Sequence, residues 1–152
     1  MKLNSLEDTF NFSQKIGKVI SNGDVIFLYG EIGVGKTTFV RGLINSLEIA
    51  QGEDTSQILS PTFNIMLDYK VNELKIIHCD LYRLKNAIDI NELGIFKTLE
   101  NHVILIEWPE LIEQKPKNLI EMFFTYSKKD LDKRNLEIKG HGKWGNYDFG
   151  KI

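Results

Sequence analysis

The most constraining feature of this sequence is a glycine-rich segment, GEIGVGKT at residues 30–37, which matches G-x-x-x-x-G-K-S/T at every fixed position. Its glycines allow a tight turn that brings backbone N–H groups onto phosphate oxygens. Lys36 can reach the β- and γ-phosphates of a nucleotide, and the Thr37 hydroxyl can ligate Mg²⁺. An apolar run, Val25–Tyr29, precedes the segment, and an amphipathic run follows it. Because strand, turn and helix are the context that this motif requires, the segment predicts a phosphate-binding loop.

The apolar runs around the loop favour an α/β domain. Helices are predicted from Ser5 to about Ser21, from Lys36 to about Leu47, and over Ile90–Leu99. Strands are predicted over Val25–Tyr29, Phe63–Tyr69, Leu74–Cys79, Val103–Ile106, Leu119–Thr125 and Leu136–Ile138. This order indicates a P-loop NTPase fold, a three-layer domain with a mixed, partly parallel sheet. We expect a single P-loop domain over residues 1–140 and a glycine-rich C-terminal tail over residues 141–152.

The composition limits where such a protein acts. The chain has 152 residues and a formal charge of −2, from 19 basic and 21 acidic residues. That balance gives no electrostatic case for broad nucleic-acid or membrane binding. The N-terminal residues are acidic and polar where a signal peptide needs an apolar run, and no apolar run is long enough to cross a membrane. The single cysteine, Cys79, leaves no intrachain disulfide, so we expect a cytoplasmic protein.

Two carboxylates are candidates for the metal side of the site, because a phosphate loop needs a further acid, usually at the end of an apolar strand. Glu107 ends the run VILIE, and Asp80 ends the run IIHCD. We assign Glu107 to Mg²⁺, directly or through water, because it follows the more apolar strand. Asp80 either holds the metal through water or helps to orient the attacking water. His78 shares a strand face with Asp80 and is either a catalytic base or a structural histidine.

Other side chains near these motifs have open roles. Arg41, Arg83 and Arg134 can each neutralise phosphate charge, with a solvated arginine as the alternative for each. Trp108 follows Glu107 and either shapes the pocket or packs in the core.

Four short segments occur in order along the chain: GEIGVGKTTFVRG at 30–42, SPTF at 60–63, HCDLYRL at 78–84 and IEWPE at 106–110. As an ordered set they resemble the TsaE family, also called YjeE, from about residue 9 to residue 140. The resemblance implies a P-loop fold with a mixed sheet, and binding and hydrolysis of ATP with Mg²⁺. It also implies work with the TsaB and TsaD proteins, which transfer a threonylcarbamoyl group to the adenosine beside the anticodon of tRNAs reading ANN codons. In that family TsaE does not transfer the group, and its ATP cycle is thought to reset the complex between turnovers.

The resemblance, together with the chemistry of the loop, places individual residues. It implies catalytic roles for Lys36, Asp80 and Glu107, and metal binding by Thr37 and Glu107. It implies nucleotide binding by the loop residues Gly33, Val34, Gly35, Lys36, Thr37 and Thr38, and by Thr9 and Arg134. Thr9 matches a position near the nucleotide base, Arg134 matches a position near the nucleotide, and Ser60–Phe63 looks like the family's switch-like segment.

Two other functions fit a phosphate loop. A small P-loop kinase of a nucleoside or metabolite needs a substrate pocket and an arginine-bearing lid, and this chain has no clear arginine-rich insertion. A nucleotide-binding switch with little turnover is the other, because Glu107 and Asp80 make hydrolysis reasonable without fixing its rate. The leading hypothesis is an ATPase subunit of a tRNA-modifying complex that is slow alone, is stimulated by its partners and contacts tRNA only indirectly.

Overall fold

The protein is described here from a computed structural model that covers residues 1–128, 130 and 133–151. Its strands are β1 (Lys2–Leu3), β2 (Val25–Tyr29), β3 (Met66–Val71), β4 (Leu74–Asp80), β5 (Val103–Glu107), β6 (Leu119–Tyr126) and β7 (Arg134–His141). Its helices are α1 (Leu6–Gly17), α2 (Lys36–Ala50) and α3 (Ala87–Leu93), with the 3₁₀ segments η1 (Ile95–Asn101), η2 (Pro109–Leu111) and η3 (Gly142–Trp144). None of the described helices combines the length and apolar character needed to cross a bilayer.

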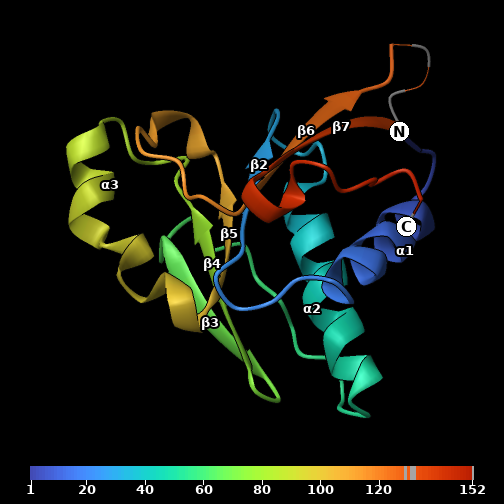
Figure 1. Ribbon diagram of the computed structural model, residues 1–152. Coiled ribbons are helices and arrows are strands. Elements are labelled where there is room, and N and C mark those ends of the chain that lie inside the picture. The colour runs from blue at the N-terminus through green and yellow to red at the C-terminus, as the bar shows by residue number, and fades with distance from the viewer. Residues whose placement is uncertain (129, 131–132, 152) are drawn as a thin grey trace.

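The described strands form one sheet in the order β1-β7-β6-β2-β5-β4-β3 (Figure 1). β2 pairs in parallel with β5 and β6, and β4 pairs in parallel with β5. The β1–β7, β6–β7 and β3–β4 pairs are antiparallel. The predicted mixed, partly parallel sheet is therefore confirmed. Because β2, β4 and β5 run the same way, their carboxyl ends meet at one edge, where Asp80 lies in register with Glu107.

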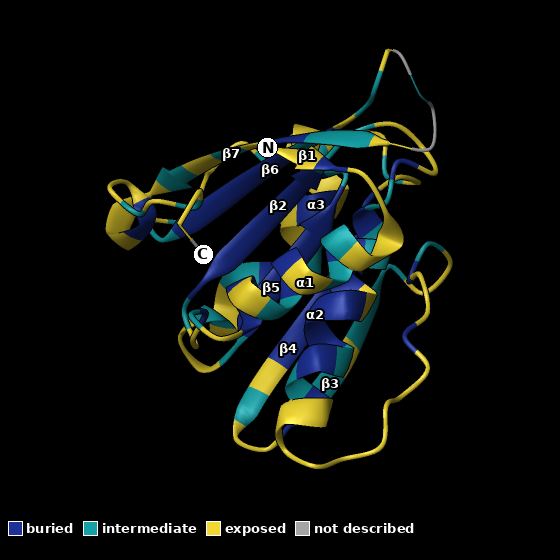
Figure 2. Cartoon of the chain, turned by 90° about the vertical axis from the view of Figure 1, so that its right-hand side faces the viewer, coloured by how far each residue is buried: buried dark blue, intermediate teal, exposed yellow. Residues whose placement is uncertain are grey.

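Two hydrophobic cores lie on the two faces of the sheet. α1 and α2 cover one face, and α3 covers the other over β4 and β5 (Figures 1 and 2). Successive side chains of a strand point to opposite faces, so Leu28 packs with Phe39 of α2, while Phe27 packs in the core beneath α3. The continuous apolar run of β2 thus reflects burial on both sides, and the three-layer arrangement is confirmed.

The helix predicted over Ile90–Leu99 is wrong in its bounds. Asn86 caps the N-terminus of α3, where its side chain accepts a hydrogen bond from the backbone N–H of Asp89. Gly94 then takes a left-handed conformation, with φ of 61°, and ends the helix. The chain continues as 3₁₀ segment η1. α1 also ends earlier than predicted, at Gly17 instead of Ser21.

The strand predicted from Phe63 begins later, at Met66. Residues 61–65 form a turn in which the N–H of Ile65 donates to the Pro61 carbonyl over 2.5 Å. Ile65 has a positive φ of 66°, which is unfavourable for a β-branched residue. Phe63 consequently lies on the surface, 84% exposed.

The C-terminal residues pack onto the domain. β7 is longer than the predicted strand Leu136–Ile138 and reaches His141. Trp144, in the segment predicted as a tail, is only 4% exposed, and Tyr147 and Phe149 pack beside it. The segment between β6 and β7 lies partly outside the described residues. β1 has no counterpart in the sequence prediction, because two residues carry no periodic pattern.

Candidate nucleotide-binding site

The glycines of the loop after β2 have conformations that other residues cannot adopt without strain. Gly30, Gly33 and Gly35 have φ angles of 136°, 76° and 115°, all in the region that favours glycine. A Cβ atom on Gly30 would also lie 2.5 Å from the Phe124 carbonyl oxygen of β6. The loop therefore combines a positive φ with close packing against the neighbouring strand.

The N-terminus of α2 closes the loop and is not capped by a side chain. Gly35 is the cap residue, and its cap position makes no side-chain hydrogen bond within the described chain. The first N–H groups of a helix have no acceptor inside that helix and favour an anion. In α2 these N–H groups lie at a cavity of about 120 Å³, which is lined by Gly33, Gly35, Lys36, Thr37, Thr38 and Glu107. These groups and this lining fit the phosphates of a nucleotide.

Lys36 is folded back against its own loop. Its ammonium donates to the carbonyl oxygens of Gly30, over 2.5 Å, and Glu31, over 3.0 Å, and lies 3.8 Å from the centre of a Trp108 ring. Burial lowers the pKa of Lys36 from its ordinary value, although nearby carboxylates, chiefly Glu107, oppose this shift. The ammonium is thus held within the loop.

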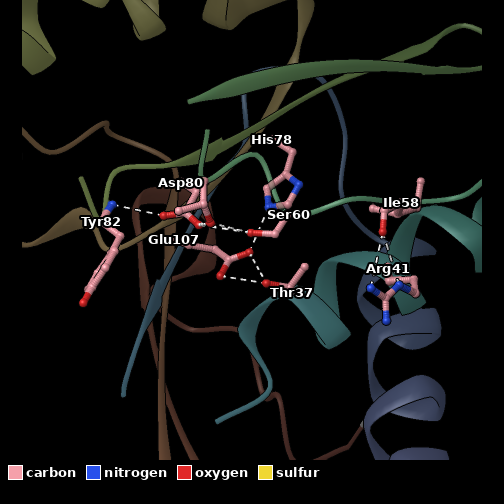
Figure 3. Close-up of polar contacts among 9 residues, drawn as sticks. Thr37, Arg41, Ile58, Ser60, His78, Asp80, Tyr82 and Glu107 are labelled. Atoms are coloured by element: carbon pink, nitrogen blue, oxygen red, sulfur yellow. Dashed lines mark hydrogen bonds and ion pairs between the residues drawn. The ribbon is translucent and has the colours of Figure 1, made fainter. Parts of the chain in front are cut away.

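The two residues predicted for the metal lie in contact. The Thr37 hydroxyl is 2.8 Å from Oε1 and 3.0 Å from Oε2 of Glu107, which is 2% exposed (Figure 3). His78 lies on the other side of this carboxylate, with Nε2 2.9 Å from Oε1. The contact arises because β5 ends beside β2, directly beneath the first turn of α2.

The donor set at Thr37 and Glu107 suits a cation that keeps other ligands. Hydroxyl and carboxylate oxygens are the ligands that Mg²⁺ prefers, and Mg²⁺ commonly retains waters and phosphate oxygens. Among the described residues, no group of three or more His, Cys, Asp and Glu side chains is placed to hold a metal ion. The residues present therefore fit Mg²⁺ bound together with a nucleotide better than Mg²⁺ bound by protein alone.

Asp80 is held by a different set of partners. Its Oδ2 accepts a hydrogen bond from Thr62 over 2.5 Å. The same oxygen accepts from Ser60 over 3.2 Å, and Oδ1 accepts from the Tyr82 N–H over 3.0 Å (Figure 3). Asp80 is 4% exposed. The acid predicted for catalysis thus anchors the segment predicted to be switch-like to the edge of the sheet where Glu107 lies.

Arg134 and Tyr126 support the loop from its outer side. Nε of Arg134 donates to the Val34 carbonyl over 2.9 Å, and the guanidinium lies 4.5 Å from the centre of the Tyr126 ring. The Tyr126 hydroxyl donates to the Ile32 carbonyl over 3.1 Å. Tyr126 was missed by sequence reasoning. The signal that could have found it is its place at the end of β6, one of the two strands that pair in parallel with β2.

Three other candidates are engaged elsewhere. Thr9 lies in α1, where its hydroxyl donates to the Ser5 carbonyl. No hydrogen bond joins it to the loop in the described part of the chain. Arg41 donates to the Ile58 carbonyl through two nitrogens (Figure 3), and Arg83 lies over the ring of Phe63.

A glycine loop between a buried parallel strand and a helix that begins at its lysine, with a carboxylate from the adjacent strand against Thr37, defines a P-loop α/β protein. The family model described as "Threonylcarbamoyl adenosine biosynthesis protein TsaE" matches residues 3–136. This chain belongs to the TsaE family.

Individual relatives agree with the family match. The protein of Rickettsia bellii (strain RML369-C) is 44% identical over 137 residues, which are 90% of this chain and 91% of that protein. The protein of Nostoc sp. (strain PCC 7120) is 35% identical over 136 residues, 87% of this chain and 80% of that protein. Both are named "tRNA threonylcarbamoyladenosine biosynthesis protein TsaE". The crystal structure of Bacillus subtilus YdiB is similar with a TM-score of 0.74 and 26% identity, over 94% of this chain and 85% of that one.

Proposed function

We propose that this protein binds and hydrolyses ATP with Mg²⁺, as the ATPase subunit of the complex that forms the threonylcarbamoyl modification on tRNA. The modified position is the adenosine next to the anticodon of tRNAs reading ANN codons. The contact between Thr37 and Glu107 at the mouth of the glycine loop carries the proposal of Mg²⁺-dependent hydrolysis. The names of the relatives support the pathway.

The loop and Lys36 bind the phosphates in this proposal. The N–H groups at the start of α2 donate to phosphate oxygens, and the positive end of the helix favours their charge. Lys36 exchanges the carbonyls of Gly30 and Glu31 for phosphate oxygens and places its charge beside them. Arg134 and Tyr126 hold the backbone of the loop through Val34 and Ile32, so that the N–H groups keep their direction.

Thr37 and Glu107 hold the metal, and Asp80 acts on the water side. Bound Mg²⁺ and ATP supply a polarised terminal phosphoryl group and the charge neutralisation that its transfer to water needs. Glu107 is buried between Thr37 and His78 and keeps its carboxylate in one place. Asp80 accepts hydrogen bonds from Ser60 and Thr62. Its other oxygen, Oδ1, which accepts from the Tyr82 N–H, can also accept a hydrogen bond from a water and orient it.

The partners follow from the pathway. TsaB and TsaD are the proposed partners, and they carry the transfer of the threonylcarbamoyl group. The net charge of −2 supports tRNA contact that is mainly indirect. We expect the isolated protein to hydrolyse ATP slowly and its partners to accelerate turnover, since conformational steps set the turnover rate of many enzymes.

The test is an ATPase assay with ATP labelled at the γ-phosphate, with and without TsaB, TsaD and tRNA. We expect label in inorganic phosphate, dependence on Mg²⁺, and strong stimulation when the partners are added. Label transferred to a nucleoside or metabolite would identify a kinase instead. Tight ATP binding with no turnover in any mixture would identify a nucleotide-binding switch.

A further inference from the structure

His78 is a buried polar residue placed directly behind the proposed metal ligand. It lies in β4 beside β5, in register with Leu105, and its side chain is 0% exposed. Its Nε2 is 2.9 Å from Oε1 of Glu107 (Figure 3). Its Nδ1 has no hydrogen-bond partner among the described residues. Within the described part of the chain, the hydrogen bond to Glu107 is therefore the one polar contact of the imidazole.

The contact fixes where the imidazole carries its proton. An ionised carboxylate only accepts hydrogen bonds, so Nε2 must be the donor. A second N–H, on Nδ1, would be buried without an acceptor, which costs more than an unused lone pair at that position. The geometry therefore makes Nε2 the ring nitrogen that donates, toward Oε1 of Glu107.

A purely structural role does not explain a histidine here. The cores around β4 are built from apolar side chains such as Ile76 and Ile77. An apolar residue of similar size would fill this volume without burying an unpaired Nδ1. What the imidazole adds is the hydrogen bond from Nε2.

We propose that His78 is a positioning residue that orients Glu107 for Mg²⁺. His78 and Thr37 both lie within hydrogen-bond distance of Oε1, whereas among the described residues only Thr37 makes a hydrogen bond to Oε2. The Nε2–H donor therefore fixes the rotation of the carboxylate and leaves Oε2 as the oxygen with free capacity toward the loop. This inference rests on the proposed function, since it concerns the metal of that site. Side chains that hydrogen-bond to a metal ligand commonly set the orientation and basicity of that ligand.

The experiment compares three substitutions of His78 that differ in where they place a donor. His78→Gln carries its amide nitrogen the same number of bonds from Cα as Nε2. His78→Asn carries it one bond closer, and His78→Leu has none. Binding of a non-hydrolysable ATP analogue is titrated with Mg²⁺, and thermal unfolding of each variant is recorded. Nitrogen NMR of the nucleotide-free wild type reports which ring nitrogen of His78 is protonated.

We expect His78→Leu and His78→Asn to raise the half-saturating Mg²⁺ concentration about 10–100-fold. His78→Gln should stay within about threefold of the wild type, and the NMR signal should show the proton on Nε2. A proton on Nδ1 would overturn the positioning role of His78 but not the proposed function. The same holds if the half-saturating Mg²⁺ concentration of the variants rises only in proportion to their loss of thermal stability. A wild type that binds no Mg²⁺–nucleotide would instead overturn the proposed function, and the positioning role with it.

Discussion

The indole N–H of Trp144 donates a hydrogen bond to Oδ1 of Asp24 over 2.9 Å, although the two residues are 120 positions apart in the chain. Asp24 is fully buried immediately before β2. Its Oδ2 accepts from the Ser21 N–H, over 2.9 Å, and pairs with the Lys143 ammonium at 2.8 Å. A buried carboxylate is tolerated only with such donors. Residues that follow β7 thus complete the base of the strand that leads to the phosphate loop.

Trp144→Phe tests this connection. The variant keeps an aromatic ring in the core but removes the donor to Asp24, so we expect the free energy of unfolding to fall by about 1–3 kcal/mol. Urea denaturation followed by circular dichroism measures the change. The control is the same substitution in an Asp24→Ala background, where it should cost less. An equal cost in both backgrounds would mean that the loss comes from ring packing and not from the hydrogen bond.

Gly30→Ala tests the packing of the loop against β6. The added methyl group would lie 2.5 Å from the Phe124 carbonyl oxygen, so the loop has to shift. We expect ATP affinity to fall more than about tenfold, a loss of about 1.4 kcal/mol. Gly23→Ala is the matched control. Gly23 also has a positive φ, of 90°, but a Cβ there meets nothing within 4 Å. Equal effects of the two variants on affinity would count against the close approach as the cause.

Lys36→Ala should abolish useful ATP binding or turnover. Lys36 is the only lysine in the loop motif, and losing its charge beside the phosphates should cost about 100-fold or more in activity. Steady-state hydrolysis measures the change, with the exposed Lys75→Ala as a control for general loss of a lysine. Unchanged hydrolysis in the Lys36 variant would remove the basis for assigning the phosphates to this loop.

Glu107→Ala should remove Mg²⁺-dependent hydrolysis while the fold survives. The variant loses the carboxylate that contacts Thr37, and we expect activity to fall about 100-fold or more. Mg²⁺ titration of activity, with circular dichroism for the fold, measures both parts. Asp80→Ala is compared in parallel. If hydrolysis survives without Glu107 and is lost without Asp80, the roles of the two acids are the reverse of those proposed.

Glu121 makes the free energy of unfolding depend on pH in the acidic range. Burial works against its ionisation, but hydrogen bonds from Lys115, Tyr29 and His141 outweigh this and hold its pKa below the ordinary value of 4.5. Because the folded-state pKa is the lower one, the stabilisation is fully present above pH 4.5 and is lost as the pH falls through the folded-state pKa. Unfolding free energy measured against pH should therefore fall less steeply below that pH in Glu121→Gln than in the wild type. Parallel curves for the two proteins would assign the acid sensitivity to other carboxylates.

Sequence reasoning reached the parts of the site that local patterns encode. The loop motif identifies Lys36 and Thr37, and the apolar strand before Glu107 places that acid at the sheet edge where the loop begins. Their contact then follows from two parallel neighbouring strands. The link from His78 to Glu107 did not follow, because it depends on the register of β4 against β5, which no local pattern specifies.

The misplaced elements have equally physical causes. The apolar spacing over 90–99 favoured one helix, whereas the left-handed Gly94 divides the segment in two. Phe63 reads as a strand residue by type, but the turn at Ile65 leaves it in solvent. Trp144 lies among glycines and polar residues, where no periodicity indicates burial. Its packing depends on Asp24, far away in the chain.

The position of β2 has a consequence for how the chain is made. β2 emerges early from the ribosome, but its partners β5 and β6 lie in the later part of the sequence. Until they are synthesised, the nascent chain displays a five-residue apolar segment with high β-propensity, VIFLY, the kind of segment that chaperones protect from self-association. Gly30 cannot pack against the Phe124 carbonyl before β6 has left the exit tunnel. The phosphate loop is therefore among the first functional segments to be translated and among the last to acquire its shape.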